Sequence, residues 1–259
     1  MTWKKTKHLW KNERQAKIGK MEPSPTFNYG WDIIYKRERM ENIIIAGESG
    51  QAKVVIDIVE REGKYRIVGL ADKNAPIGAP LLGYQVIGRD KDLPSLINKY
   101  SIKGAIVAIG DNWRRYQVTE KLKHIAPKLV FISAIHTSAQ LARDVEIGIG
   151  TVIMPGVIIN SSCKIGNFCI LNTAASIDHD SKMEDFSSLA PNATIGGNVN
   201  IDAFTAVLLG ANVIHGTKIG KHTVIGAGAT VLEDIPSNVV AYGTPARVMK
   251  NRNKGDKYL

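Results

Sequence analysis

His179 and Asp180 are neighbouring side chains with a clear potential for acid–base chemistry. Gly197 follows His179 by eighteen residues, a spacing that the repeat described below makes significant. A histidine beside a carboxylate can act as a general base, and a glycine N–H close to it can bind an oxyanion. A histidine on an exposed face is usually a plain surface residue, so this candidate depends on the elements that position it.

A second group of candidates lies at the ends of predicted strands. These residues are polar or glycine and stand in three segments: Gly47, Ser49 and Gly50; Asp72; and Gly110, Asp111 and Asn112. N–H groups at a helix start bind phosphate, and an acidic residue after the second strand is placed to bind a ribose or base. Each segment alone could be a turn or helix cap. Their convergence at the carboxyl edge of a sheet favours a nucleotide-linked ligand.

Both groups of candidate residues must be positioned by secondary structure, and most of that structure is predicted by a six-residue repeat. From Ile135 to Pro236 the pattern runs seventeen times without an insertion or deletion, with an aliphatic first position and a small or β-branched fifth position. Such a period is typical of a parallel β-helix, in which three units form one coil and residues eighteen apart stack. We expect the aliphatic residues inside and glycines at the corners, where little room remains for a Cβ: Gly148, Gly166, Gly196, Gly220 and Gly226. Cys163 and Cys169 fall on fifth positions, so we interpret them as small core residues of a protein in a reducing compartment.

The rest of the chain divides around this repeat. Residues 40–133 alternate strands and helices, which predicts a doubly wound α/β domain. Strands are expected at 42–47, 65–72, 84–88, 104–110 and 128–133, and helices at 50–62, 91–100 and 113–124. The β-helix domain then occupies 134–236. Residues 237–259 leave the repeat and form a turn and a basic tail.

Charge is concentrated at the N-terminus. The formal net charge is +10, and residues 1–39 carry 10 Lys or Arg against 4 Asp or Glu. We interpret this segment as a disordered or absent extension, or else as a basic aromatic arm that touches an anionic membrane surface or a partner. It lacks the apolar region of a signal peptide, and no run of about eighteen apolar residues predicts a membrane span. Outside residues 1–39 the net positive charge is small and widely spread, which argues against nucleic-acid binding. We expect a cytoplasmic protein.

Taken together, "IIIAGESGQAKVV", "NTAASIDHDSKM" and "AYGTPARV" resemble the bacterial sugar acyltransferases of the PglD/NeuD type, over about residues 41–250. The resemblance implies a Rossmann-like domain joined to a left-handed parallel β-helix, assembled as a homotrimer. It also implies transfer of acetyl from acetyl-CoA to the amino group of a UDP- or GDP-linked amino sugar, for a bacterial surface glycan or exopolysaccharide. The first guess for that sugar is UDP-4-amino-4,6-dideoxy-N-acetylglucosamine.

The resemblance also implies roles for individual residues. His179 matches the catalytic base, Asp180 the acid that orients it, and Gly197 the glycine whose N–H meets the thioester carbonyl. The strand-end segments listed above, Asn112 included, match the nucleotide-sugar site. Gly243, Pro245 and Ala246 match the segment that closes over coenzyme A, and Arg247 begins the basic tail, whose cations could contact its phosphates.

Two departures from the family pattern stand out. Gln51 occupies a position where many members carry His, which alters phosphate or uracil contacts. Ser188 occupies a position where some carry a second His, so a hydrogen bond to the acetyl group is either absent or made by the hydroxyl.

Other functions remain open. The first is O-acetylation of a sugar or sialic acid, which the sequence does not separate from N-acetylation. The second is a β-helix binding module that has lost catalysis. The third is a zinc protein like the γ-carbonic anhydrases, for which His179, His215 and His222 invite comparison. Because His222 falls on a different side of the prism and zinc needs three converging donors, we expect no metal.

Overall fold

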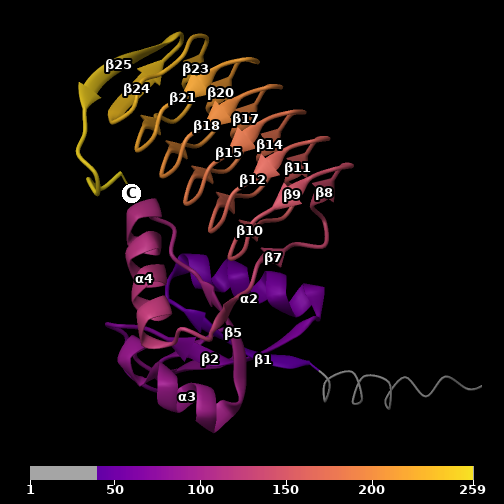
Figure 1. The fold of residues 1–259 in the computed structure, drawn as a ribbon, viewed down its shortest axis with the longest axis vertical. Helices are drawn as coiled ribbons and strands as arrows, with labels where there is room; N and C mark the ends of the chain where they lie inside the picture. Colours follow the sequence, from indigo (N-terminus) through magenta and orange to yellow (C-terminus); the bar gives the residue numbers. More distant parts are fainter. Residues whose placement is uncertain (1–39, 259) are drawn as a thin grey trace, which may run out of the picture. The chain divides into compact units, whose positions relative to one another are not determined.

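A computed structural model describes residues 40–258, in which an α/β part precedes a β-helix (Figure 1). The predictions for residues 1–39 lie outside the described residues. The first sheet has the order β3-β4-β2-β1-β5-β6. Its strands are β1 (Glu41–Ala46), β2 (Tyr65–Ala71), β3 (Pro80–Leu81), β4 (Tyr84–Gly88), β5 (Ile102–Val107) and β6 (Val130–Phe131). The helices are α2 (Gly50–Glu62), α3 (Leu93–Tyr100) and α4 (Asn112–Ile125), and a 3₁₀ turn, η1 (Asp90–Asp92), precedes α3.

Sequence and structure agree closely in this part. β1 pairs in parallel with β2 and β5, and its central residues Ile43, Ile44 and Ile45 are at most 1% exposed. A strand buried on both faces reads as a continuous apolar run, as this one does. The helix expected at 91–100 is divided into η1 and α3 because Pro94 lies in the first turn of α3. The strand expected at 104–110 ends at Val107, so residues 108–110 form a loop at the sheet edge.

The six-residue repeat forms a three-sided parallel β-helix, as predicted. Side 1 contains β7, β10, β13, β16, β19 and β22, side 2 contains β8, β11, β14, β17, β20 and β23, and side 3 contains β9, β12, β15, β18 and β21. Strands eighteen residues apart pair in parallel. The bounds are β7 (Ala134–Ile135), β8 (Gln140–Leu141), β9 (Glu146–Ile147), β10 (Val152–Ile153), β11 (Ile158–Ile159), β12 (Lys164–Ile165), β13 (Ile170–Leu171), β14 (Ser176–Ile177), β15 (Lys182–Met183), β16 (Ser188–Leu189), β17 (Thr194–Ile195), β18 (Asn200–Ile201), β19 (Ala206–Val207), β20 (Asn212–Val213), β21 (Lys218–Ile219), β22 (Val224–Ile225) and β23 (Thr230–Val231).

The first-position aliphatic residues fill the prism from Ile153 onward. Leu141 is 40% exposed because it lies in the first coil, which has no coil beneath it. The corners turn at the fourth position of each unit, where φ lies between +53° and +73° from Asp144 to Gly228. The five second-position glycines instead lie where the next coil passes: a Cβ on Gly148 would be 2.5 Å from the carbonyl carbon of Gly166. The prediction that these glycines have no room for a Cβ is confirmed. The prediction that they stand at the corners is wrong, because the chain turns two residues later, at the fourth position.

Both cysteines belong to this core, as expected. Cys163 and Cys169 are 0% exposed and unpaired. Burial raises the pKa of the Cys169 thiol to about 11, so at neutral pH it is a protonated, small apolar side chain.

The α/β part packs against one corner of the prism, between sides 3 and 1. Four aromatic rings stack along that corner, with centroids 4.6–5.4 Å apart: Phe168, Phe186, Phe204 and His222. Trp113 and Tyr116 of α4 pack edge-on against this aromatic column. The Arg115 side chain is fully buried beneath α4 and donates hydrogen bonds to Phe168 O at 2.8 Å and Phe186 O at 3.3 Å. α4 therefore joins the α/β part to this corner, and α2 makes a second contact on side 1, where Ile56 shares a core with Val152 and Met154.

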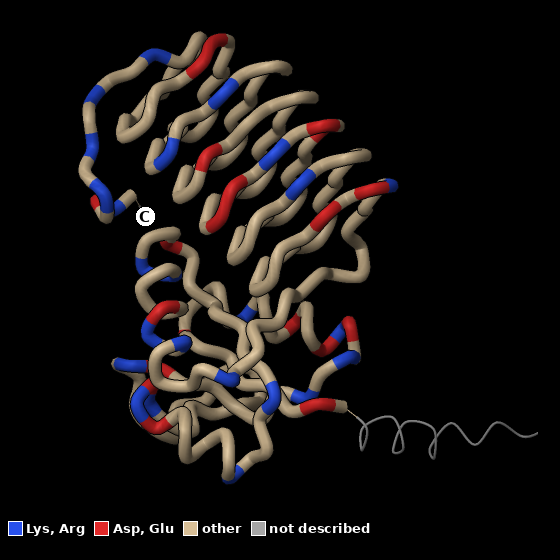
Figure 2. Tube along the Cα trace, viewed as in Figure 1, with Lys and Arg blue, Asp and Glu red and all other residues tan. Residues whose placement is uncertain are grey.

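The other end of the prism is closed by a hairpin of β24 (Val239–Gly243) and β25 (Ala246–Asn251). Its residues Val239, Ala241 and Ala246 are buried in the prism core. The chain then runs back toward α4, with several Lys and Arg residues along this stretch (Figure 2). Within residues 40–258, no helix has the length and apolar character that a membrane span requires.

Candidate active site

His179 lies in the turn after β14, at the corner between sides 2 and 3. Its Nδ1 is 2.8 Å from Oδ2 of Asp180, and the two side chains are 60% and 62% exposed. Asp180 occupies the fourth-position turn with φ +59°. The six-residue geometry therefore directs the carboxylate back toward the imidazole of the preceding residue, and the pair faces solvent.

A second carboxylate supports the histidine from below. Asp178 Oδ1 accepts hydrogen bonds from the His179 N–H at 2.8 Å and from Asn160 Nδ2 at 2.7 Å. The hydrogen bond that His179 Nδ1 donates to Asp180, with the nearby charge of Asp178, raises the pKa of His179 above its ordinary value. The hydrogen bonds from Asn160 and from the His179 N–H lower the pKa of Asp178. The imidazole therefore has a fixed orientation and increased basicity.

Gly197 lies beneath the imidazole in the next coil. A Cβ on Gly197 would be 2.8 Å from His179 Nε2, so only glycine leaves room for the ring in this position. Within the described part of the chain, the Gly197 N–H donates no hydrogen bond. The spacing of eighteen residues thus brings an imidazole, a carboxylate and a backbone N–H together, and the catalytic roles expected for them remain predictions.

Such an arrangement can remove a proton from a nucleophile. Nε2 is the free ring nitrogen, because Nδ1 is engaged by Asp180. The Asp180 contact favours the tautomer with hydrogen on Nδ1, which leaves the Nε2 lone pair available. A donor N–H within reach of the same space can stabilise a negatively charged oxygen as it develops.

The predicted nucleotide site forms a cavity of about 410 Å³ at the carboxyl ends of β1, β2 and β5. The residues around it come from all three strand-end segments, together with α4 and the C-terminus: Gly47, Glu48, Ser49, Gln51, Asp72, Ile109, Gly110, Asp111, Arg114 and Lys257. The expected convergence of Gly47, Ser49, Asp72, Gly110 and Asp111 is therefore present. Arg114 was missed, and Lys257 was expected only among the tail cations beside coenzyme A. Both are exposed cations that the packing of α4 and the C-terminus brings here.

Backbone geometry shapes this cavity. Gly47 has φ +118°, and a Cβ there would be 2.9 Å from Ala108 O. Asp72 accepts hydrogen bonds from the N–H groups of Glu48 at 3.0 Å, Asn74 at 2.7 Å and Ala75 at 2.9 Å. Asp72 thus holds the turn before α2 in place while it lines the cavity.

The first turn of α2 leaves hydrogen-bond donors unused. Ser49 is its N-cap residue and makes no side-chain cap hydrogen bond. Gln51 carries a buried Nε2 for which no partner exists within residues 40–258. A helix start with free N–H groups and an unpaired amide suits a ligand rich in acceptor oxygens.

Two predicted substrate residues lie elsewhere. Asn112 is 1% exposed, donates from Nδ2 to Thr205 O at 3.1 Å and accepts a hydrogen bond from Arg115, so it joins α4 to the prism. Gly50 begins α2 on its exposed side and does not line the cavity. The sequence located both residues correctly at the sheet edge but could not show which of them faced the cavity.

The predicted coenzyme segment is a hairpin turn. Gly243 and Pro245 are exposed, and Ala246 is 5% exposed and closes the prism. Arg247 lies 3.5 Å from Glu233 in an exposed ion pair. Ser188, at the start of β16 on side 1, hydrogen bonds the Tyr258 hydroxyl, which also accepts a hydrogen bond from the Asn112 N–H at 2.9 Å. Ser188 on side 1 thus contacts Tyr258, near the C-terminus, whereas His179 of the same chain lies at the corner between sides 2 and 3.

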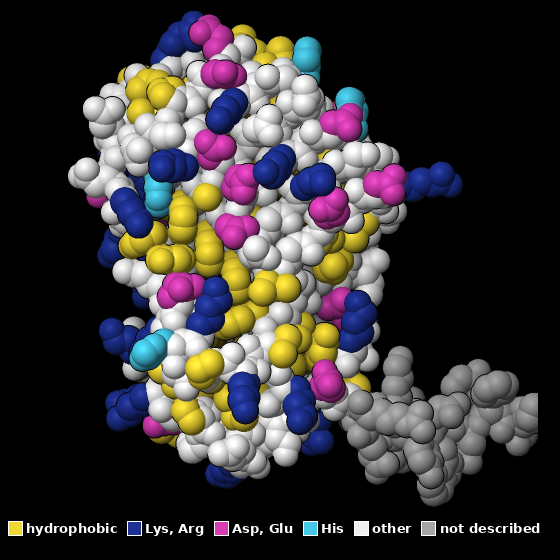
Figure 3. Space-filling view, in the orientation of Figure 1, with side chains coloured by type: hydrophobic (Ala, Val, Ile, Leu, Met, Phe, Trp, Pro, Cys, Tyr) yellow, Lys and Arg dark blue, Asp and Glu magenta, His cyan; other side chains and the backbone are white. Residues whose placement is uncertain are grey.

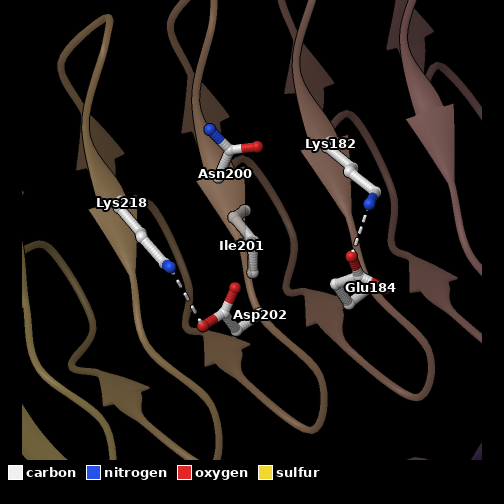
Figure 4. Close-up of a pocket in the computed structure, with 6 residues that line it drawn as sticks. All are labelled: Lys182, Glu184, Asn200, Ile201, Asp202 and Lys218. Atoms are coloured by element: carbon white, nitrogen blue, oxygen red, sulfur yellow. Dashed lines mark ion pairs between the residues drawn. The ribbon is translucent and has the colours of Figure 1, made fainter.

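Side 3 carries a different kind of surface. A depression of about 340 Å³ there is lined by Lys182 and Glu184, paired at 2.6 Å, and by Lys218 and Asp202, 3.9 Å apart (Figure 4). Basic and acidic side chains are interspersed over the visible face of the molecule (Figure 3). Within the depression, each of these four charged side chains has a neighbour of opposite charge.

No three His, Cys, Asp or Glu side chains converge in the described part of the chain. His222, one of the three histidines of the zinc alternative, stacks on Phe204 at the aromatic corner. His179 lies at the corner between sides 2 and 3, and His222 at the corner between sides 3 and 1. These histidines do not form a common site within one chain.

The comparisons with known proteins agree with this geometry. Residues 42–122 match the family described as the PglD N-terminal domain. Over 81% of the chain, the structure is similar to a variant of GDP-perosamine N-acetyltransferase from Caulobacter crescentus, solved with CoA and GDP-perosamine, with 33% identity, a TM-score of 0.76 and 97% of that protein covered. It is similar to the acetyltransferase domain of PglB from Neisseria gonorrhoeae FA1090, at 27% identity, and to WeeI from Acinetobacter baumannii AYE, at 26%. The TM-scores are 0.71 and 0.73, over 81% of this chain and 100% of each of those.

Proposed function

The chain belongs to the family of PglD-type sugar N-acetyltransferases, and we propose that it transfers acetyl from acetyl-CoA to the amino group of a nucleotide-linked amino sugar. The observation that carries this proposal is the exposed His179–Asp180 pair above the free N–H of Gly197. Structures of two relatives support acetyl-CoA and an amino sugar nucleotide as the substrates. One relative was solved with CoA and GDP-perosamine, and another with acetyl coenzyme A.

The reaction follows from these groups. The sugar amine attacks the thioester carbonyl carbon, while His179 Nε2 takes the proton that the amine loses. Asp180 stabilises the imidazolium that results, and the Gly197 N–H stabilises the oxyanion. The tetrahedral intermediate then expels the coenzyme A thiolate, which receives the proton from His179. The products are the amide and free coenzyme A, and no acyl-enzyme is required because the thioester is already activated.

We further propose that the active enzyme is a homotrimer with sites between subunits. The cavity lies at the start of α4, which packs on the aromatic corner, whereas His179 lies at another corner of the same prism. A sugar nucleotide in one subunit therefore meets the His179 of a neighbour. Side 2 exposes Ile158, Ile214 and Leu232, apolar side chains suited to a subunit contact.

The test is acetyl transfer to a panel of acceptors. Purified protein is mixed with acetyl-CoA and UDP-4-amino-4,6-dideoxy-N-acetylglucosamine, GDP-perosamine or sialic acid, and free thiol release is measured. We expect turnover with an amino sugar nucleotide, and His179→Ala should lower kcat by about 10²–10⁴-fold with little change in coenzyme binding. Turnover only with the hydroxyl acceptor would replace N-acetylation by O-acetylation, and wild-type turnover in the variant would refute the role of His179.

A further inference from the structure

The last residues of the described chain form an ordered segment, 252–258, which we name the C-terminal strap. Arg252 is 9% exposed, and its guanidinium donates to His222 O at 2.8 Å and to Asp256 O. The Asn253 N–H donates to Asp256 Oδ2 at 2.6 Å, which closes a tight turn. The strap is therefore built by specific hydrogen bonds, although its sequence reads as a solvated basic tail.

The strap is also fitted to α4. Lys254 Nζ lies 4.3 Å from the ring centre of Trp113, a cation–π contact. Gly255 has φ +87°, and a Cβ there would be 2.9 Å from the same indole. Tyr258 then accepts a hydrogen bond from the Asn112 N–H, in the first turn of α4. These contacts lead the chain to the helix start that borders the nucleotide cavity.

Lys257, held between Gly255 and Tyr258, lines that cavity together with Arg114. Neither side chain has a hydrogen-bond or ion-pair partner within residues 40–258. The carboxylates of Asp72 and Asp111, by contrast, already accept backbone hydrogen bonds. Alongside these carboxylates and that of Glu48, the cavity thus holds two cations, the uncapped start of α2 and the buried Nε2 of Gln51, all of which can bind phosphate oxygens.

We propose that the C-terminal strap is part of the sugar-nucleotide site, where Lys257 and Arg114 bind the diphosphate of the substrate. This inference rests on the proposed function, because that function supplies a nucleoside diphosphate sugar. An ammonium and a guanidinium on opposite elements can each bind a phosphate oxygen. The strap would then connect the end of the hairpin formed by β24 and β25 to the sugar-nucleotide site.

The experiment measures binding separately from catalysis. UDP and GDP are titrated into wild-type protein, Lys257→Ala, Lys257→Arg and the control Lys128→Ala, which removes an exposed lysine of the α/β part that does not line the cavity. We expect Lys257→Ala to weaken diphosphate binding about tenfold and Lys257→Arg to restore most of it. The KM for the sugar nucleotide should rise in parallel, while kcat and the KM for acetyl-CoA stay within about twofold.

The outcomes separate the two proposals. Unchanged diphosphate affinity in Lys257→Ala, or an equal loss in Lys128→Ala, overturns the role of the strap. If the wild-type protein binds neither UDP nor GDP, the cavity is not a nucleotide site and this inference fails as well. If diphosphate binding depends on Lys257 but no amino sugar is acetylated, the strap assignment stands and the proposed reaction is wrong.

Discussion

At the level of single residues, the basicity of the candidate base depends on two neighbouring carboxylates. Asp180 contacts Nδ1 of His179 directly, and Asp178 lies beneath its backbone. Both raise the pKa of His179, and the hydrogen bond that Asp180 accepts has the largest effect. Because a base acts only when unprotonated, kcat/KM should decline at low pH as His179 gains a proton, and the raised pKa places this decline at higher pH than for an ordinary histidine.

We expect Asp180→Asn to move that acidic limb to lower pH, because the neutral amide no longer stabilises the imidazolium. Asn is chosen since it tolerates the φ of +59° at this position. At the optimum, kcat/KM should fall by about 10- to 1,000-fold. Asp178→Asn keeps a hydrogen-bond acceptor and removes only the charge, so its shift should be smaller and in the same direction. A pH profile of kcat/KM with an unmoved limb in Asp180→Asn would refute the pairing.

Much of the catalytic arrangement could be predicted at this scale. A strict period fixes which side chains stack, so His179 and Gly197 could be placed together from their spacing alone. The support from Asn160 to Asp178 follows the same spacing but was missed, because an Asn and an Asp on a repeat surface have no feature that distinguishes them. Asn112 could not be placed, since its burial depends on how α4 packs.

At the level of elements, α4 is a helix of the α/β part that packs on the aromatic corner of the prism. Arg115 reads in the sequence as an ordinary surface residue between Arg114 and Tyr116. The structure instead buries it completely, with hydrogen bonds to Phe168 O and to Gly110 O. Burial lowers the pKa of its guanidinium, yet the surrounding carbonyl groups satisfy its donors. No local pattern reveals this role, because three of the carbonyl groups, those of Phe168, Phe186 and Ser187, belong to a corner of the prism distant in sequence.

Removing Arg115 should therefore destabilise the fold. We expect Arg115→Ala to lower the free energy of unfolding by about 3–5 kcal/mol, since it leaves several buried carbonyl groups without donors. The neighbouring Arg114→Ala should change it by no more than about 0.5 kcal/mol, because that side chain is exposed. Denaturant unfolding of both variants tests this pair. Equal stabilities would mean that Arg115 does not hold α4 on the prism.

At the level of the whole molecule, the repeat predicts a prism but not the arrangement of its three sides. Side 1 contacts the α/β part, where Val152 and Met154 join Ile56 of α2 in one core. Side 3 carries paired charges, and side 2 exposes apolar side chains. These differences between the sides depend on the outward-facing residues of each unit, and the six-residue pattern does not restrict which residue types occupy those positions. The sequence could therefore predict the coil and the stacking of His179 on Gly197, but not that the candidate nucleotide cavity lies near a different corner.

This separation makes a quantitative prediction about assembly. Two variants are each expected to be inactive: His179→Ala, which lacks the base, and Ser49→Trp, whose ring should fill the cavity of about 410 Å³. If one subunit supplies the cavity and the next supplies His179, mixed trimers regain intact sites wherever a His179→Ala subunit donates its cavity to a Ser49→Trp neighbour. Random mixing in equal amounts gives about a quarter of wild-type activity.

The measurement is acetyl transfer by the two variants co-expressed and purified together, compared with the same two proteins purified separately and mixed without exchange. A site built within a single chain cannot be restored by mixing, because each chain lacks one half of it. Activity in the co-expressed sample alone would therefore place the base and the nucleotide on different subunits. Its absence, with mixed oligomers present, would place them on the same chain and require the cavity and His179 to meet within one subunit.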